Sequence, residues 1–221
     1  MSRGAQETPH PPATSEFGFV EPGGAAHIYQ AAGGITIKKF SVGDYDNNVY
    51  VISSDGKAVI VDGAADPDRI LAEVEGLRVL SIVETHGHFD HVQALPALLA
   101  ALDAPVLAHP ADVIPVPSEP LRGGERLPVG STHIEVTHTP GHTPGSLCYL
   151  LGDQLFSGDT LFPGGPGNTR GDPHAFEEIM RSVDGLFSSL PDSTRVSPGH
   201  GLDTTIGRER PYVEIWRARG W

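Results

Sequence analysis

The seven residues from Thr85 to His91, Thr-His-Gly-His-Phe-Asp-His, include four side chains that can bind a metal. His86 and His88 are two residues apart, so both side chains point the same way in an extended loop. Asp90 and His91 lie further along and must point elsewhere. One metal ion could be coordinated by two of these histidines, but hardly by His86, His88, Asp90 and His91 together. The spacing therefore predicts two adjacent metal sites, each of which needs further ligands.

The elements around this segment place it at the end of a strand. Residues Val79–Val83 are apolar or β-branched apart from Ser81 and predict a buried strand, while the Ala/Leu-rich run Gln93–Leu102 predicts a helix. Open α/β sheets bind ligands at such carboxyl ends of strands. Gly87 stands where a Cβ would obstruct the turn.

Three other loops, each after a predicted strand, offer further ligands. His142 lies between two Pro-Gly pairs, which favour a tight turn. Asp159 follows a glycine at the end of a predicted hairpin, and His200 is flanked by glycines. We expect one metal to be held by His86, His88 and His142. We expect the second to be held by Asp90, His91 and His200, with Asp159 bridging both.

The remaining histidines and the single cysteine lack this context. We expect surface positions for His10, His27, His133 and His174, whereas His109 and His138 could line the cleft. Cys148 alternates with apolar residues along a predicted strand, and no activating base is evident beside it. It is therefore expected in the core rather than as a nucleophile.

The rest of the chain predicts an α/β fold in which two mixed sheets pack face to face with helices outside. The strands are expected at Ile35–Phe40, Asn48–Ser53, Lys57–Asp62, Pro105–Ala108, Thr132–Thr137, Ser146–Leu151, Gln154–Ser157 and Arg195–Ser197. Two pairs of these form hairpins, at Ser54-Asp55-Gly56 and Gly152-Asp153. Further helices are expected from Pro67 through Gly76 with Asp66 as N-cap, over Ala175–Leu190, and within Ile206–Trp221. Residues 110–130 and 162–172 are expected to be loops.

Composition narrows the class of protein. The 221 residues fit one domain, and we expect a mobile tail over residues 1–20 followed by a single domain over 21–221. The net charge of −13 argues against a nucleic-acid partner. No apolar stretch could span a membrane, and no signal peptide is evident. The single cysteine fits a reducing cytosol, and together with the metal-binding motifs we expect a cytoplasmic enzyme with a small-molecule substrate, which could form a homodimer.

The combined motifs resemble the metallo-β-lactamase superfamily, and within it the glyoxalase II (hydroxyacylglutathione hydrolase) group. They are Thr-His-x-His-x-Asp-His, Thr-Pro-Gly-His-Thr-Pro-Gly, Gly-Asp-Thr-Leu-Phe and Pro-Gly-His-Gly. The resemblance implies a four-layer αββα sandwich with two divalent ions, Zn or Fe, with Mn as a further option. It also implies that Asp62 supports the ligands from behind, with Thr85 and Thr143 as weaker candidates.

The same resemblance implies a reaction. A hydroxide shared by the two metals would attack a thioester carbonyl, and Asp90 would orient it as well as bind the second metal. Glyoxalase II carries a C-terminal helical domain that helps to bind glutathione, but this chain ends soon after His200. The acyl group and the carrier thiol therefore stay open. The loop residues Asn168, Thr169 and Arg170 could meet an anionic part of the substrate.

Alternatives with the same fold remain. A persulfide dioxygenase would use a single iron at His86, His142 and Asp159, but such enzymes tend to carry a Cys-Gly-Arg-Thr-Asp stretch that residues 165–172 lack. A lactone hydrolase would share all seven ligands. A true β-lactamase would replace Asp159 and be exported, and a nuclease would need an inserted domain and a basic surface.

Overall fold

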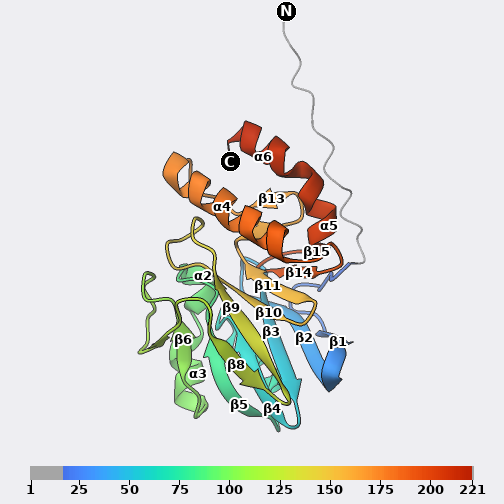
Figure 1. Cartoon of the computed structure of the whole chain (residues 1–221). Coiled ribbons are helices and arrows are strands. Elements are labelled where there is room, and N and C mark those ends of the chain that lie inside the picture. The colour runs from blue at the N-terminus through green and yellow to red at the C-terminus, as the bar shows by residue number, and fades with distance from the viewer. Residues whose placement is uncertain (1–16, 221) are drawn as a thin grey trace, which may run out of the picture.

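The computed structural model describes residues 17–220 and contains two large β-sheets that pack face to face (Figure 1). The first sheet has the strand order β1-β2-β3-β4-β5-β6-β7. These strands are β1 His27–Ala31, β2 Ile35–Val42, β3 Asn47–Ser54, β4 Lys57–Val61, β5 Arg78–Val83, β6 Val106–Ala108 and β7 Glu119–Pro120. The second sheet has the order β15-β14-β11-β10-β9-β8. Its strands are β8 Arg126–Val129, β9 Thr132–His138, β10 Leu147–Leu151, β11 Gln154–Gly158, β14 Arg195–Pro198 and β15 Thr204–Thr205.

Helices cover the outer faces of both sheets, and a small separate hairpin joins the second sheet to its helices. The helices are α1 Pro67–Glu73, α2 Phe89–Val92, α3 Leu95–Ala101, α4 Pro173–Ser189, α5 Ile206–Glu209 and α6 Val213–Arg219, with short 3-10 turns at Ala32–Gly34 and Arg210–Tyr212. The small hairpin is β12 Leu161–Phe162 with β13 Gly165–Pro166. No helix within residues 17–220 is long and apolar enough to cross a membrane.

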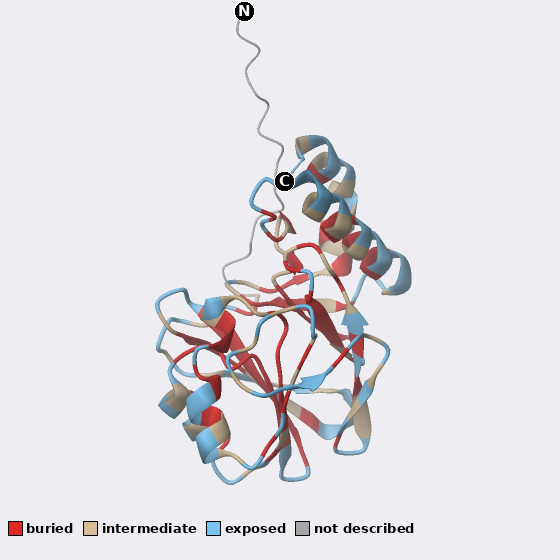
Figure 2. Ribbon diagram, turned by 90° about the vertical axis from the view of Figure 1, so that its left-hand side faces the viewer, coloured by how far each residue is buried: buried red, intermediate tan, exposed pale blue. Residues whose placement is uncertain are grey.

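Three apolar layers hold this sandwich together (Figure 2). Ile70 of α1 and Leu98 of α3 pack on the outer face of the first sheet. The inner faces of the sheets meet in the middle layer, where the Tyr50 and Phe156 rings lie 5.0 Å apart, edge to face. Helices α4 and α6 pack on the outer face of the second sheet, and the side chain of Cys148 is part of this third layer. Sheets that are buried on both faces have rigid strand ends, and the predicted αββα sandwich is confirmed.

The predicted hairpins are confirmed, because β3 pairs antiparallel with β4 and β10 with β11. The prediction of loops over residues 110–130 and 162–172 was wrong in part, since β7, β8 and β13 lie within these ranges and β12 ends in the second of them. Strands β7 and β8 form sheet edges, where a proline such as Pro120 or Pro128 is tolerated because one side of the strand is unpaired. The unpredicted β1 is also an edge strand, and its Ile28 is exposed.

The helix predicted over residues 93–102 begins instead at Leu95, with Pro96 in its first turn. A separate short helix, α2, carries Asp90 and His91, so these two residues lie on a helical turn rather than on an extended loop. The cap prediction for α1 was also wrong. Asp66 makes no capping hydrogen bond, and its carboxylate instead accepts one from the Gly43 N–H at 2.8 Å. Helix α1 ends at Glu73, before Gly76.

The end of the expected N-terminal tail contacts the sandwich through a buried ion pair. Residues 1–16 lie outside the described part of the chain, but the Gly18 carbonyl accepts a hydrogen bond from Nζ of Lys39 at 2.7 Å. The same ammonium donates to Gly201 O and to Oδ1 of Asp203, both at 2.7 Å. Lys39 is fully buried, and burial lowers its pKa while Asp203 opposes that shift. The network ties β2 to the segment that follows His200.

Replacing this lysine tests how far the network stabilises the fold. We expect Lys39→Met to lower the free energy of unfolding by about 3–5 kcal/mol, because it removes one charge of a buried pair. The neighbouring Lys38, whose pair with Glu73 is partly exposed, provides the matched control, and Lys38→Met should cost no more than about 1 kcal/mol. Urea denaturation of both variants measures the difference. Equal losses of stability in the two variants would show that the buried network around Lys39 contributes no more than the exposed pair of Lys38.

Candidate metal centre

The predicted ligands converge at one edge of the sandwich, from strand ends of both sheets. The loop after β5 carries His86 and His88, and the loop from β9 to β10 carries His142. Asp159 directly follows β11, and His200 follows the parallel strand β14. The two sheets are joined at this edge, since the Leu147 N–H donates to the Thr85 carbonyl at 2.7 Å.

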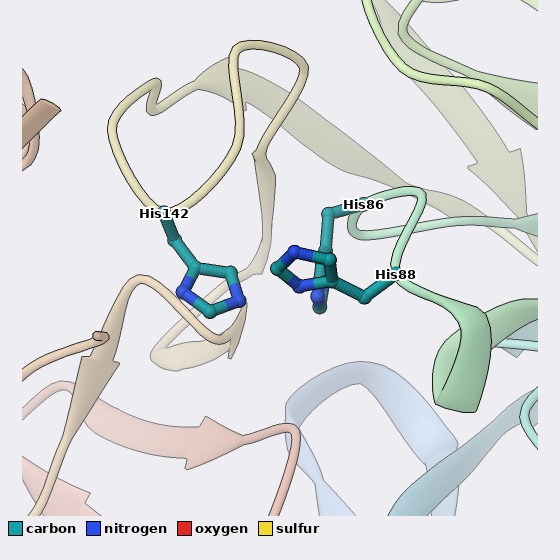
Figure 3. Close-up of side chains that lie close together, drawn as sticks. All are labelled: His86, His88 and His142. Atoms are coloured by element: carbon teal, nitrogen blue, oxygen red, sulfur yellow. The ribbon is translucent and has the colours of Figure 1, made fainter. Parts of the chain in front are cut away.

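The first predicted group is brought together as a triangle of imidazoles (Figure 3). The ring centroids of His86 and His88 lie 4.8 Å apart, as do those of His86 and His142, and His88 lies 4.6 Å from His142. One nitrogen from each ring lies within 4.8 Å of the others. The three rings come from two separate loops and face a common point.

The second predicted group lies beside the first. Asp90, His91 and His200 offer ligand atoms within 4.8 Å of one another. Nε2 of His200 is 3.3 Å from Oδ2 of Asp90 and 3.2 Å from Nε2 of His91. Asp159 reaches both groups, with Oδ2 at 3.4 Å from Nε2 of His142 and Oδ1 at 3.6 Å from Nε2 of His91.

Several polar atoms that face this centre lack a hydrogen-bond partner. Nε2 of His86, Nε2 of His142 and Oδ1 of Asp159 are buried without one among residues 17–220. Buried polar atoms without a partner cost about 1–3 kcal/mol each. All three are lone-pair donors, and Zn and Fe are bound by this set of nitrogen and carboxylate ligands. The residues therefore fit a metal.

Hydrogen bonds to the opposite ring nitrogen set the orientation of three histidines. Nδ1 of His91 lies 2.8 Å from Oδ2 of Asp62, and Nδ1 of His142 lies 2.9 Å from the Asn168 carbonyl. Nδ1 of His200 lies 2.9 Å from the Tyr45 carbonyl. These oxygens accept a hydrogen bond from Nδ1–H, so the Nε2 that is directed at the centre is the atom that can offer a lone pair to a metal. This is the arrangement usual for histidines that bind metals.

Asp62 supports two of the candidate ligand histidines, as the resemblance implied. Besides its contact with His91, its carboxylate accepts hydrogen bonds from the Thr85 N–H at 2.7 Å and from the Thr85 hydroxyl at 2.9 Å. Oγ1 of Thr85, having donated its proton to Asp62, is left to accept from Nδ1 of His86 at 3.1 Å. Thr143, the other weaker candidate, binds Ser146 and Asp112 instead of a ligand.

The carboxylates make the centre attractive to a cation. Burial lowers the pKa of His86 well below its ordinary value, and the neighbouring histidines lower it further. Burial also opposes the charged form of His91, but Asp62, Asp159 and Asp90 outweigh it and raise the pKa of His91 to about 9. The carboxylates therefore stabilise a positive charge at His91. A bound cation could supply this charge in place of the second proton on the imidazole.

Two residues that the sequence did not indicate hold the ligands in place. The Asn47 side-chain amide donates to Oδ2 of Asp90 at 2.9 Å. Burial alone would raise the pKa of Asp90, but this hydrogen bond and His91 more than offset it. Asp112 accepts hydrogen bonds from the Gly87 N–H at 2.8 Å, from the Thr143 hydroxyl at 2.6 Å and from the Gly145 N–H at 2.8 Å. It thus connects the loop of His86 and His88 to the loop of His142, and no local motif marks it.

Glycines allow the loops to approach this closely. A Cβ at Gly199 would lie 2.7 Å from Cε1 of His91 and would also overlap Oδ1 of Asp159. A Cβ at Gly87 would lie 2.9 Å from Cβ of Asp112. The predicted obstruction at Gly87 is thus confirmed, and its cause is crowding by Asp112.

The histidines outside the predicted set lie elsewhere among the described residues. His109 and His138 stack on each other with centroids 4.1 Å apart, outside the candidate ligand groups. His27 and His174 are exposed and His133 is partly exposed, while His10 lies outside the described residues. Cys148 is fully buried, and burial raises its pKa to about 11, so the thiol is a core residue, as predicted.

The contacts of Asp112 predict a role in metal affinity. We expect Asp112→Ala to weaken zinc binding by about tenfold to a hundredfold, because removal of a group that orients ligands has effects of this size. Competition with a chelating dye measures the dissociation constant. Asp103→Ala, an exposed site with the same change in charge, is the control. An unchanged constant for Asp112→Ala would show that the two loops hold their positions without it.

Comparison with known proteins places this centre in a family. Residues 42–200, most of the chain, match the family model described as the metallo-beta-lactamase superfamily. A hydroxyacylglutathione hydrolase from Anaeromyxobacter dehalogenans (strain 2CP-C) is 39% identical over 160 residues, which make up 70% of this chain and 61% of that protein. This chain thus matches less than two thirds of the length of that relative.

Solved structures agree with the family model. The crystal structure of TTHA1623 in a di-iron-bound form is 37% identical with a TM-score of 0.69, over 77% of this chain and 95% of that one. The crystal structure of ETHE1 from Myxococcus xanthus is 30% identical with a TM-score of 0.72, and the match covers 79% of this chain and 81% of that one. The chain therefore belongs to the metallo-β-lactamase superfamily, as its histidine and aspartate motifs predicted.

Proposed function

We propose that this protein is a dinuclear metal-dependent hydrolase that cleaves a thioester of a small molecule. The observation that carries the proposal is the pair of ligand groups joined by Asp159. Its two carboxylate oxygens lie 3.4 Å from Nε2 of His142 and 3.6 Å from Nε2 of His91, one residue of each group. A bridging carboxylate of this kind suits two ions about 3.5–4 Å apart.

The seven ligands would divide as the sequence predicts. His86, His88 and His142 would hold one divalent ion, and Asp90, His91 and His200 the other. When bound, such a pair of ions lowers the pKa of a water molecule toward neutrality and polarises a carbonyl group. Support for a divalent metal also comes from the similarity to a protein that binds two irons.

The protein's own groups would position the reactants. Asn47 donates a hydrogen bond to Asp90 and helps to keep its carboxylate ionised, so Asp90 could accept a hydrogen bond from the attacking water and orient it. Asn47 also fixes the direction of that carboxylate. Departure of a thiolate needs little help from an acid, which suits a centre whose histidines all point their lone pairs inward. The similarity to a hydroxyacylglutathione hydrolase supports a thioester as substrate.

A second candidate function is the oxidation of a persulfide with one iron at His86, His142 and Asp159. These three residues lie together, since Oδ2 of Asp159 is 3.4 Å from Nε2 of His142 and the His86 and His142 rings are 4.8 Å apart. The similarity to ETHE1 is compatible with this alternative as well as with a hydrolase. A lactone hydrolase would use the full set of seven ligands.

Metal content separates the two main candidates. We expect close to two Zn or Fe atoms per chain by elemental analysis of protein purified without added metal or chelator. Asp159→Ala should lower that content and reduce turnover by more than about a hundredfold, because loss of a bridging ligand should exceed the effect of losing a group that only orients one. Asp153→Ala, an exposed site in the preceding hairpin, is the matched control. Full activity in Asp159→Ala would refute the dinuclear mechanism.

Substrate assays complete the test. Wild-type protein is expected to hydrolyse thioesters such as lactoylglutathione, and chelation of its metal should abolish that activity. Close to one Fe without Zn, together with oxygen consumption on addition of a thiol persulfide, would favour the dioxygenase instead. Hydrolysis of lactones in preference to thioesters would reassign the substrate class and retain the metal chemistry.

A further inference from the structure

A pocket of about 440 Å³ opens directly beside the first ligand group. His88 and His142 line one side of it, and Thr169 and Arg170, from the loop between β13 and α4, line another. The pocket therefore adjoins the position where a substrate carbonyl would meet the first metal. The polar groups that line the pocket can therefore bind a second functional group of the substrate and select for it.

Arg170 reaches the centre without being one of its ligands. Its Nη2 lies 3.2 Å from Nε2 of His88. Its backbone N–H donates to Oδ1 of Asn168 at 2.7 Å, and the Asn168 carbonyl accepts from His142 at 2.9 Å. The same short loop thus orients a ligand through its backbone and presents a guanidinium to the pocket.

The contact between Arg170 and His88 leaves Nδ1 of His88 as the atom available to a metal. A histidine bound through Nδ1 carries its proton on Nε2. Nε2 of His88 and the guanidinium are then both hydrogen-bond donors, and donors do not bind each other. Two donors 3.2 Å apart that face one pocket can share an anionic oxygen between them.

Two further observations point to an anion in this pocket. Oγ1 of Thr169 is buried and has no hydrogen-bond partner among residues 17–220, although the residue lines the pocket. No carboxylate within that part of the chain lies within 4.0 Å of the Arg170 guanidinium, although the chain carries a net charge of −13. An arginine without a carboxylate partner in so acidic a protein is available for an anionic ligand.

The two carboxylates that also line the pocket, Asp172 and Glu178, interact with groups other than Arg170. Oδ1 of Asp172 caps α4 by accepting from the N–H groups of His174 and Ala175, at 2.8 and 3.2 Å. Glu178 lies 3.8 Å from Nδ1 of His174 and 3.9 Å from Nη2 of Arg181. Neither group cancels the charge of Arg170.

We propose that the substrate carries a carboxylate, and that Arg170, with the hydroxyl of Thr169 and Nε2–H of His88, binds it in this pocket. Arg170 is then the residue that selects anionic substrates, and it takes no part in metal binding. This inference rests on the proposed hydrolase function for the identity of the substrate, and its test separates the two.

Three thioesters test the inference and locate the charge. Acetyl-N-acetylcysteamine is neutral, acetyl-N-acetylcysteine carries a carboxylate on the thiol, and succinyl-N-acetylcysteamine carries one on the acyl group. We expect wild-type protein to prefer one anionic thioester. Arg170→Ala should raise KM for that compound by about tenfold to a hundredfold and leave the neutral one unchanged, because one charge-assisted contact is lost. Arg170→Lys should restore part of the loss.

The control is Arg126→Ala, which removes an equal charge on the far sheet edge, where Arg126 pairs with Glu135. It should leave all three KM values unchanged, so that any effect of net charge alone is excluded. The backbone of Arg170 is left-handed, with φ 55°, and Arg170→Ala keeps a Cβ at that position, so the variant tests the rest of the side chain. Equal losses on neutral and anionic thioesters in Arg170→Ala would overturn the proposal.

Binding without turnover distinguishes failure of this inference from failure of the hydrolase function. The probes are ketone analogues of the same three compounds, in which a methylene separates sulfur from the carbonyl, and calorimetry gives their dissociation constants. An anionic preference that Arg170→Ala abolishes supports the inference even if no thioester is hydrolysed. Equal affinity of wild-type protein for neutral and anionic ketones overturns it, even if thioesters are hydrolysed.

Discussion

The structure depends on one constraint, which is that imidazole and carboxylate lone pairs must be held together at a buried edge. Nε2 of His86 and Nε2 of His142 point at this centre without protein partners among the described residues. Such an arrangement repels itself unless a cation is present, so the protein has to fix each ring from behind. Asp62 does this for His91, while backbone carbonyls do it for His142 and His200.

The double sandwich supplies the rigidity that this constraint requires. Strands β5, β11 and β14 are largely buried on both faces, so the loops that leave them start from fixed points. Asp112 then joins two ligand loops by three hydrogen bonds, which no single strand could do. Gly199 contributes by having no side chain, because a Cβ there would occupy the space of Asp159 and His91.

The sequence predicted the ligand loops and hairpins because their signals are local. His86 to His91 and the Pro-Gly pairs around His142 are read within a few residues, and buried strands show as apolar runs. Asn47 and Asp112 were missed because their contacts join distant segments, such as Asn47 to Asp90, 43 residues apart. The edge strands were missed because exposed edges follow no apolar pattern, as the exposed Ile28 of β1 illustrates.

In the loop after β13, the backbone and a side chain make different contacts with the centre. The backbone orients His142 through the Asn168 carbonyl, so the metal ligand does not depend on which side chain stands at position 170. The contact between Asn168 and His142 therefore does not require an arginine at position 170, whose guanidinium lies 3.2 Å from Nε2 of His88 instead. If the proposals hold, orientation of a metal ligand and selection of the substrate would thus be carried by different atoms of the same short segment. A fold that keeps its seven ligands can acquire a new substrate by changing a residue that holds no metal.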